Sequence, residues 1–309
     1  MTGSGTARRL GGFGLALVVA FAAAYGVGQA VGPVAAEPEP AAGAHEDMGE
    51  EAGGGHGDAH GGAATAPVPK GLTVAADGYT LDVRSTAVRA GARTDFAFRV
   101  LDDHGAPVTR FAPTHDKLMH LIVARRDLSG FQHVHPVLAA DGTWHVPVTF
   151  AAAGAYRVFA DFLPAGRDDA TTLGADVVVT GAYQPVPLSP PSRTATVDGY
   201  TVTLAGELVP GTSSKLTLSV AKDGEPVTDL QPYLAAYGHL IALRQGDLAY
   251  LHVHPDGEPG DGRTKPGPAI TFYADVPSAD TYRLYLDFQH GGVVRTAEFT
   301  AVAEPHEEK

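Results

Sequence analysis

The sequence predicts an all-β protein with two tandem antiparallel β-sandwich domains, and three observations support this prediction. The 309 residues include 38 glycines and 23 prolines, which indicates many turns and short strands rather than long helices. Apolar and polar residues alternate over short runs, for example at 94–100, 216–220 and 282–288. An internal repeat extends over most of the chain, so we expect two copies of one domain.

The N-terminal part is typical of an export signal or a membrane anchor. We expect residues 1–9, with two arginines, to stay in the cytoplasm, and the uncharged segment 10–32 to cross the membrane, since about 20 residues suffice. A cleaved signal usually has a shorter apolar region of about 7–15 residues, which favours a single-pass anchor. The C-terminal domains would then lie outside the cytoplasm. Secretion after cleavage at Val34-Ala35-Ala36 is the alternative.

Linkers separate the predicted parts of the chain. Residues 33–70 are rich in Ala, Gly, His and acidic residues and lack an apolar period, so we expect a disordered linker. We place the first sandwich at 71–182, a proline-rich linker at 183–194 and the second sandwich at 195–303. A short tail follows at 304–309.

Matching motifs define the repeat. Asp77-Gly78-Tyr79-Thr80 recurs as Asp198-Gly199-Tyr200-Thr201, and His133-Val134-His135-Pro136 recurs as His252-Val253-His254-Pro255. Each unit has roughly seven strand-like runs in about 100 residues, which predicts an immunoglobulin-like or cupredoxin-like sandwich. Tyr156 and Tyr282 stand where the tyrosine corner of such a fold would be.

Three histidines recur at matched positions: His120, His133 and His135 in the first unit, and His239, His252 and His254 in the second. Because side chains alternate across a strand, both histidines of each His-x-His segment share one face. A hairpin centred between Asp127 and Leu128 would place His120 opposite His135, and a turn at Gly246-Asp247 would place His239 opposite His254. Opposed Cβ atoms lie about 5 Å apart, so each triad could converge on one ion.

Four further residues are weaker candidates for ligands: His115, Met119, Asp161 and Asp287. His115 and Met119 could add a fourth or softer ligand, but the second unit has Leu234 and Gly238 at these positions. Asp161 and Asp287 recur in register, yet each follows an arginine four residues earlier on the same strand face. An ion pair with Arg157 or Arg283 is therefore the favoured interpretation of the two aspartates.

The residue types limit which metal could bind. The chain has no cysteine, so thiolate ligands are excluded. Imidazoles with a carboxylate or thioether suit copper or zinc, and the order of affinities favours Cu²⁺. Zinc is the alternative, because three histidines and a water also form its catalytic arrangement. A structural or proton-sensing histidine cluster is the other explanation for the triads.

Charge and motifs exclude several functions. A net charge of −13 argues against binding to nucleic acid. The sequence has no nucleophile elbow, phosphate loop or His-Glu-x-x-His helix, so we expect no enzyme. We expect a protein that binds, buffers or transfers copper outside the cytoplasm, with another envelope metal-handling protein as a partner. The alternative is an adhesion or scaffold module of the cell envelope with structural histidines.

Two segments resemble a known group of proteins. His115-Asp116-Lys117-Leu118-Met119-His120-Leu121-Ile122-Val123 and Phe131-Gln132-His133-Val134-His135-Pro136 are similar to those of actinobacterial secreted or membrane-anchored proteins described as heavy-metal-binding. Those proteins resemble the YtkA-like and CopC-like sandwich domains of bacterial copper handling. The resemblance covers about residues 70–303 and implies an immunoglobulin-like sandwich with a role in metal trafficking. The second unit lacks the His-Asp-Lys element.

Overall fold

The computed structural model describes residues 69–305 except 86 and 252. The predicted anchor at 10–32 and nearly all of the predicted linker at 33–70 lie outside the described residues. All regular secondary structure in the described part is β-strand, which confirms the predicted all-β class. Within that part, no helix has the length and apolar character needed to cross a bilayer.

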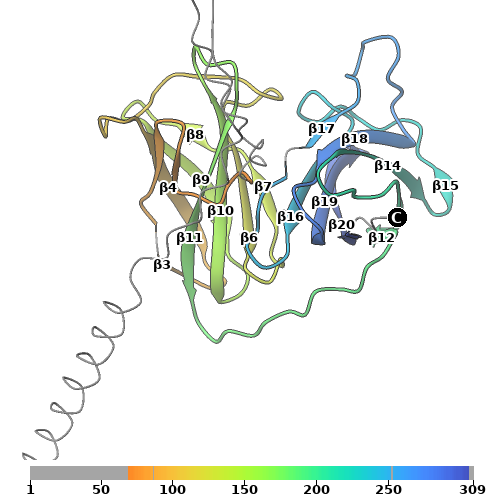
Figure 1. Cartoon of the computed structure of the whole chain (residues 1–309), viewed down its shortest axis with the longest axis horizontal. Helices are drawn as coiled ribbons and strands as arrows, with labels where there is room; N and C mark the ends of the chain where they lie inside the picture. Colours follow the sequence, from red (N-terminus) through yellow and green to blue (C-terminus); the bar gives the residue numbers. More distant parts are fainter. Residues whose placement is uncertain (1–68, 86, 252, 306–309) are drawn as a thin grey trace, which may run out of the picture. The chain divides into compact units, whose positions relative to one another are not determined.

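The first repeat forms two sheets, with the strand orders β1-β2-β4-β9-β8 and β3-β11-β10-β6-β7 (Figure 1). β5 pairs with β10 beside the second sheet, and only the pairing of β3 with β11 is parallel among the described strands of this repeat. The strands are β1 (Ala75–Ala76), β2 (Tyr79–Val83), β3 (Ala87–Arg89), β4 (Arg93–Leu101), β5 (Phe111–Ala112), β6 (His120–Arg125), β7 (Gln132–Val134), β8 (Val137–Leu138), β9 (Thr143–Thr149), β10 (Gly154–Pro164) and β11 (Thr171–Thr180).

The second repeat also forms two sheets, with the orders β12-β13-β14-β18-β17 and β16-β19-β20. β15 pairs with β14. The strands are β12 (Thr194–Val197), β13 (Tyr200–Ala205), β14 (Ser213–Lys222), β15 (Glu225–Pro226), β16 (His239–Arg244), β17 (Val253–Pro255), β18 (Ala269–Asp275), β19 (Asp280–His290) and β20 (Val293–Ala303). The predicted alternating runs therefore lie in β4, β14 and β19.

Each repeat buries its own apolar core, as the alternating patterns require. Trp144 and Phe98 stack in the first core, with ring centroids 6.4 Å apart. The predicted tyrosine corners are present in both repeats. The hydroxyl of Tyr156 donates to the carbonyl of Ala152 at 3.0 Å, and that of Tyr282 to the carbonyl of Ser278 at 2.8 Å.

A third apolar cluster joins the two repeats. Its buried members are Ile122, Ala124, Leu128 and Phe159 from the first repeat and Ile241, Leu243, Leu248 and Tyr285 from the second. Phe131 of the first repeat stacks on Tyr285 at 3.9 Å between ring centroids, and Tyr250 of the second repeat packs on Phe159 at 5.7 Å. These contacts bring β6 and β10 of one repeat against β16 and β19 of the other, and two of the predicted histidines, His120 and His239, lie on β6 and β16.

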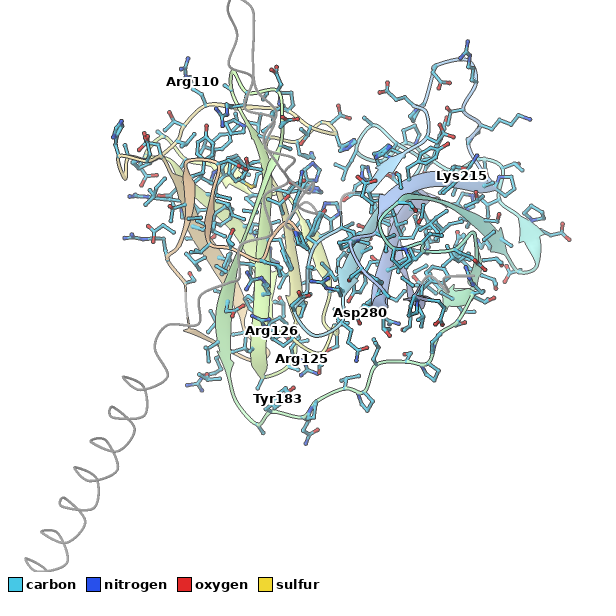
Figure 2. All side chains as sticks on the ribbon, viewed as in Figure 1. Arg110, Arg125, Arg126, Tyr183, Lys215 and Asp280 are labelled. Carbon is cyan, nitrogen blue, oxygen red and sulfur yellow. The ribbon has the colours of Figure 1, made fainter. Side chains whose placement is uncertain are left out.

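An ion pair at the end of β6 predicts a pH-dependent stability. Arg125 contacts Asp127 at 2.7 Å. The guanidinium of Arg125 also lies over the ring of Tyr183, and both residues are labelled in Figure 2. Burial would raise the pKa of Asp127, but hydrogen bonds from Arg125, the Val186 N–H and Ser129 outweigh it and lower this pKa to about 2. Because the pKa is lower in the folded state, the stabilisation is present above about pH 4 and is lost as the pH falls through about 2.

Urea unfolding of the wild type and the Asp127→Asn variant would test this pH dependence. We expect the wild type to be more stable by up to about 2 kcal/mol above pH 4, and the gap to close toward pH 2. A gap that stays constant from pH 6 to pH 2 would contradict the prediction.

Candidate metal centre

His120 and His133 are placed by a hairpin with the predicted register. Leu121 pairs with Val134 and Ile122 with His133 across β6 and β7, so His120 and His135 lie one step beyond the paired strands. The alternation of side chains then puts all three histidines on one face of the sheet. The arrangement expected for the first repeat is observed.

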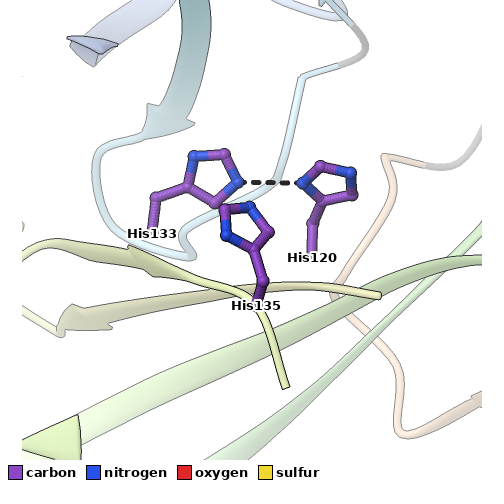
Figure 3. A group of neighbouring side chains, drawn as sticks. All are labelled: His120, His133 and His135. Atoms are coloured by element: carbon purple, nitrogen blue, oxygen red, sulfur yellow. Dashed lines mark hydrogen bonds between the residues drawn. The ribbon is translucent and has the colours of Figure 1, made fainter. Parts of the chain in front are cut away.

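The three imidazole rings converge (Figure 3). His120, His133 and His135, called the three-histidine site below, each offer a ligand nitrogen, and these nitrogens all lie within 4.8 Å of one another. The ring centroids are 5.3, 5.0 and 4.8 Å apart for the three pairs. Two imidazoles bound tetrahedrally to one ion at about 2.0–2.1 Å have centroids roughly 5 Å apart, so the spacing suits a shared ion.

Hydrogen bonds determine which nitrogens carry lone pairs. Nε2 of His120 lies 2.9 Å from the Thr114 carbonyl oxygen, which can only accept a hydrogen bond. Nε2 therefore carries the proton, and Nδ1 carries the lone pair. Nδ1 of His133 donates to Oδ2 of Asp287 at 2.9 Å, which leaves its Nε2 free. These two free nitrogens face each other at 3.0 Å. Either a shared proton or a metal ion is needed between them.

A third nitrogen distinguishes the two possibilities. Nε2 of His135 is buried and has no hydrogen-bond partner among the described residues. A proton shared by His120 and His133 would leave this buried nitrogen unsatisfied, which costs free energy. One cation bound by all three rings would satisfy every lone pair.

The carboxylate that orients His133 comes from the other repeat. Asp287 lies on β19, and the side chains of His133 and Asp287 are each only 4% exposed. Oδ1 of Asp287 accepts a hydrogen bond from the Thr296 hydroxyl at 2.6 Å, so this carboxylate is held in place. Metal-binding histidines commonly donate their second N–H to a carboxylate, which fixes the ring and its tautomer.

Burial keeps the imidazoles neutral and therefore able to bind a metal. Burial, followed by the nearby His133, lowers the pKa of His120 to about 4, and the same two causes lower that of His135 to about 3. Both rings are therefore neutral at neutral pH, and each has one nitrogen lone pair that can bind a metal without the loss of a proton.

Of the other predicted ligands, Met119 lies away from the three-histidine site, whereas His115 and His239 lie near it. Met119 is fully buried in the apolar core of the first repeat, because it precedes His120 and faces the opposite side of the strand. His239 and His115 come close to the three-histidine site, with centroid distances of 6.2 Å to His133 and 6.1 Å to His120. His239 therefore joins the cluster of the first repeat.

The expected pairing of His239 with His254 is wrong. Leu243 bridges to Tyr250 as the predicted hairpin requires, but β17 then pairs with β18 in the other sheet, with His254 opposite Tyr273. His254 is exposed, and its ring stacks on Tyr273 at 5.6 Å. His252 lies outside the described residues. The chain changes sheets earlier here than in the first repeat, where β8 takes the corresponding edge position.

The interpretation of the two aspartates as arginine partners is also wrong. Arg157 pairs with Asp176 at 2.9 Å, and Arg283 pairs with Glu298. Asp161 instead accepts from the Thr172 hydroxyl at 2.7 Å, as Asp287 does from Thr296. Each aspartate stands directly opposite a recurring histidine, Asp161 opposite His120 and Asp287 opposite His239. The recurrence of both aspartates at matched positions was the feature of the sequence that pointed to a role for them. The sequence did not show that Asp287 of the second repeat contacts His133 of the first.

A local turn explains how the buried histidine of β6 is held. His115 and Asp116 both have positive φ values, 48° and 61°, in a turn closed by Thr114 and Lys117. This turn directs the Thr114 carbonyl at His120. The second repeat builds the same turn with Leu234 and Ala235, and its carbonyls accept from His239.

The comparisons with known proteins identify a duplicated domain. A family described as "Domain of unknown function (DUF8832)" matches residues 73–179 and again residues 195–305. A search of the curated proteins gave no match. The match supports the internal repeat, while the resemblance to YtkA-like and CopC-like domains stays a prediction.

Similar solved structures are distant. A DUF4426 family protein from Pseudomonas aeruginosa shares 8% identity, with 38% of this chain and all (100%) of that chain covered, at a TM-score of 0.27. The Escherichia coli adhesin FdeC shares 15% identity, with 75% of this chain and 65% of that chain covered, at a TM-score of 0.23. Similarities this weak give no argument about function.

Proposed function

The chain belongs to the DUF8832 family, whose domain it contains twice, and we propose that its three-histidine site binds a transition-metal ion. Copper is the first candidate and zinc the alternative. The observation that supports this most directly is the convergence of three nitrogen lone pairs, one of them on a buried atom without a partner. We further propose that the protein buffers or transfers this metal outside the cytoplasm, held at the membrane by residues 10–32.

The set of donors limits the metal. Three neutral imidazoles are borderline ligands that suit Cu²⁺ and Zn²⁺, whereas Ca²⁺ and Mg²⁺ prefer oxygen. Asp287 adds a negative charge next to the site without using its oxygen as a ligand, since it accepts from His133 and Thr296. A divalent ion would therefore be partly neutralised in a buried environment.

The alternative of an adhesion or scaffold module leaves the geometry unexplained. Buried side-chain nitrogens of structural histidines normally have a hydrogen-bond partner. Here two lone pairs face each other at 3.0 Å and the His135 nitrogen has no described partner. A module with purely structural histidines would gain stability by removing this arrangement.

Calorimetric titration of the full chain with Cu²⁺ and, separately, Zn²⁺ tests the proposal. The test variant carries His133→Ala and His135→Ala. The matched control carries His104→Ala and His145→Ala, two histidines with side chains 85% and 43% exposed and away from the site. We expect the wild type and the control to bind one tight equivalent that the test variant lacks.

The folded state of the variants and the choice between Cu²⁺ and Zn²⁺ are checked separately. Far-ultraviolet circular dichroism should show that both variants keep the β-sheet signal. If the test variant is folded and binds as many tight equivalents as the wild type, the three-histidine site is not a metal centre. Tighter binding of Zn²⁺ than of Cu²⁺ would select the alternative metal.

A further inference from the structure

A small cavity lies next to the three-histidine site, between the two repeats. It encloses about 60 Å³. Its polar lining residues are His115, His120, His133, Asp161, His239 and Tyr250. One water needs at least about 10–15 Å³ of such space, so the cavity has room for a hydrated ion. Two of its histidines, His115 and His239, are not used by the proposed site.

His239 presents a free nitrogen at this cavity. Its residue is 8% exposed, and its Nε2 lies 2.9 Å and 3.0 Å from the carbonyl oxygens of Tyr233 and Leu234. Nε2 therefore donates, and Nδ1 is the lone-pair nitrogen. No described residue donates a hydrogen bond to this Nδ1.

His115 stands beside His239 at a ligand spacing. Their ring centroids are 5.1 Å apart, within the 4.8 to 5.3 Å range of the three-histidine site. The separations of this pair from that site are longer, 6.1 Å from His115 to His120 and 6.2 Å from His239 to His133. Because imidazoles on one ion lie roughly 5 Å apart, His115 and His239 are placed to share an ion of their own.

Asp161 and Tyr250, the other polar residues of the cavity, are also suited to a bound ion. Asp161 uses Oδ1 to accept from Thr172, and its Oδ2 has no described partner. Burial, followed by the nearby Asp161 and Asp287, raises the pKa of Tyr250, so its hydroxyl stays protonated and can donate to a bound water. Two aspartates near two cation positions would limit the repulsion between the ions.

We propose that the cavity holds a second transition-metal ion, bound by His115 and His239 and with Asp161 as a nearby negative charge in the cavity lining, beside the ion of the three-histidine site. This inference rests on the proposed function and extends it, because the two repeats together would form a two-metal centre. His115 is exposed at the rim, so it would also be the first ligand that an arriving or leaving ion meets.

The number and proximity of bound Cu²⁺ ions in the full chain test this inference. Equilibrium dialysis measures the equivalents, and electron paramagnetic resonance detects spin coupling between neighbouring Cu²⁺ ions. The test variants are His115→Asn with His239→Ala, and His115→Asn alone. Asparagine tolerates the left-handed backbone of position 115, and this residue is exposed, so the single variant should fold. His104→Ala with His145→Ala is the control.

We expect the wild type and the control to bind one more equivalent than the double variant and to show a half-field signal that the double variant lacks. In the His115→Asn variant, the affinity for the second Cu²⁺ equivalent should be lower by about tenfold or more. Equal equivalents and no half-field signal in any protein would overturn the second position. The His133→Ala, His135→Ala variant separates the two ideas, because it loses the first equivalent only if the three-histidine site is real.

Discussion

Replacing Asp287 with asparagine is expected to lower the affinity of the three-histidine site for Cu²⁺ by about 10–100-fold. The amide is nearly the same size as the carboxylate, so the contact with Thr296 can remain. Its NH₂ group would face Nδ1 of His133 and favour the opposite tautomer, with the proton on Nε2. That proton would occupy the lone pair that must bind the metal, and the negative charge would also be lost.

Asp95→Asn is the matched control for this change. Asp95 contacts Nδ1 of His145 at 3.0 Å, but this pair is on the surface of the first repeat, with side chains 70% and 43% exposed. Competition titration with a Cu²⁺ chelator measures both affinities. Unchanged affinity in a folded Asp287→Asn protein would mean that the second repeat does not tune the site.

Replacing Tyr285 with alanine is expected to lower the free energy of unfolding by about 3–5 kcal/mol, as for other large buried aromatic residues. Tyr285 is 0% exposed, stacks on Phe131 and donates its hydroxyl to the Leu128 carbonyl, so it contacts the first repeat in two ways. It also lies two residues from Asp287 on β19. We therefore expect the affinity for Cu²⁺ to fall with the stability.

Tyr285→Phe separates the two contacts. Phenylalanine keeps the stacking on Phe131 but leaves the buried carbonyl of Leu128 without its donor, which should cost about 1–3 kcal/mol. Tyr273→Ala, at a half-buried tyrosine outside the apolar cluster between the repeats, is the control and should cost less than Tyr285→Ala. Urea unfolding measures all three variants. An alanine variant no less stable than the phenylalanine variant would show that the stacking contributes little.

The sequence by itself determined the features that depend on short-range patterns. Alternation of apolar residues located strands such as β4 and β19, and the recurring motifs identified the duplication. The distance along the chain from His120 to the His-x-His segment predicted the register of β6 and β7, because a tight turn leaves few ways to pair two adjacent strands. The convergence of His120, His133 and His135 followed from that register.

Only the tertiary structure decided how the second repeat contributes. Its His-x-His segment has the same local pattern, but β17 pairs with β18, so His254 is exposed while His239 stays buried beside the first repeat. Asp287, likewise, contacts His133 across the two repeats rather than Arg283 four residues earlier. Alternation and turn length are local properties, whereas the choice between two sheets and the contact between two repeats depend on long-range packing. Two copies of one motif therefore take different roles around a single cluster of histidines.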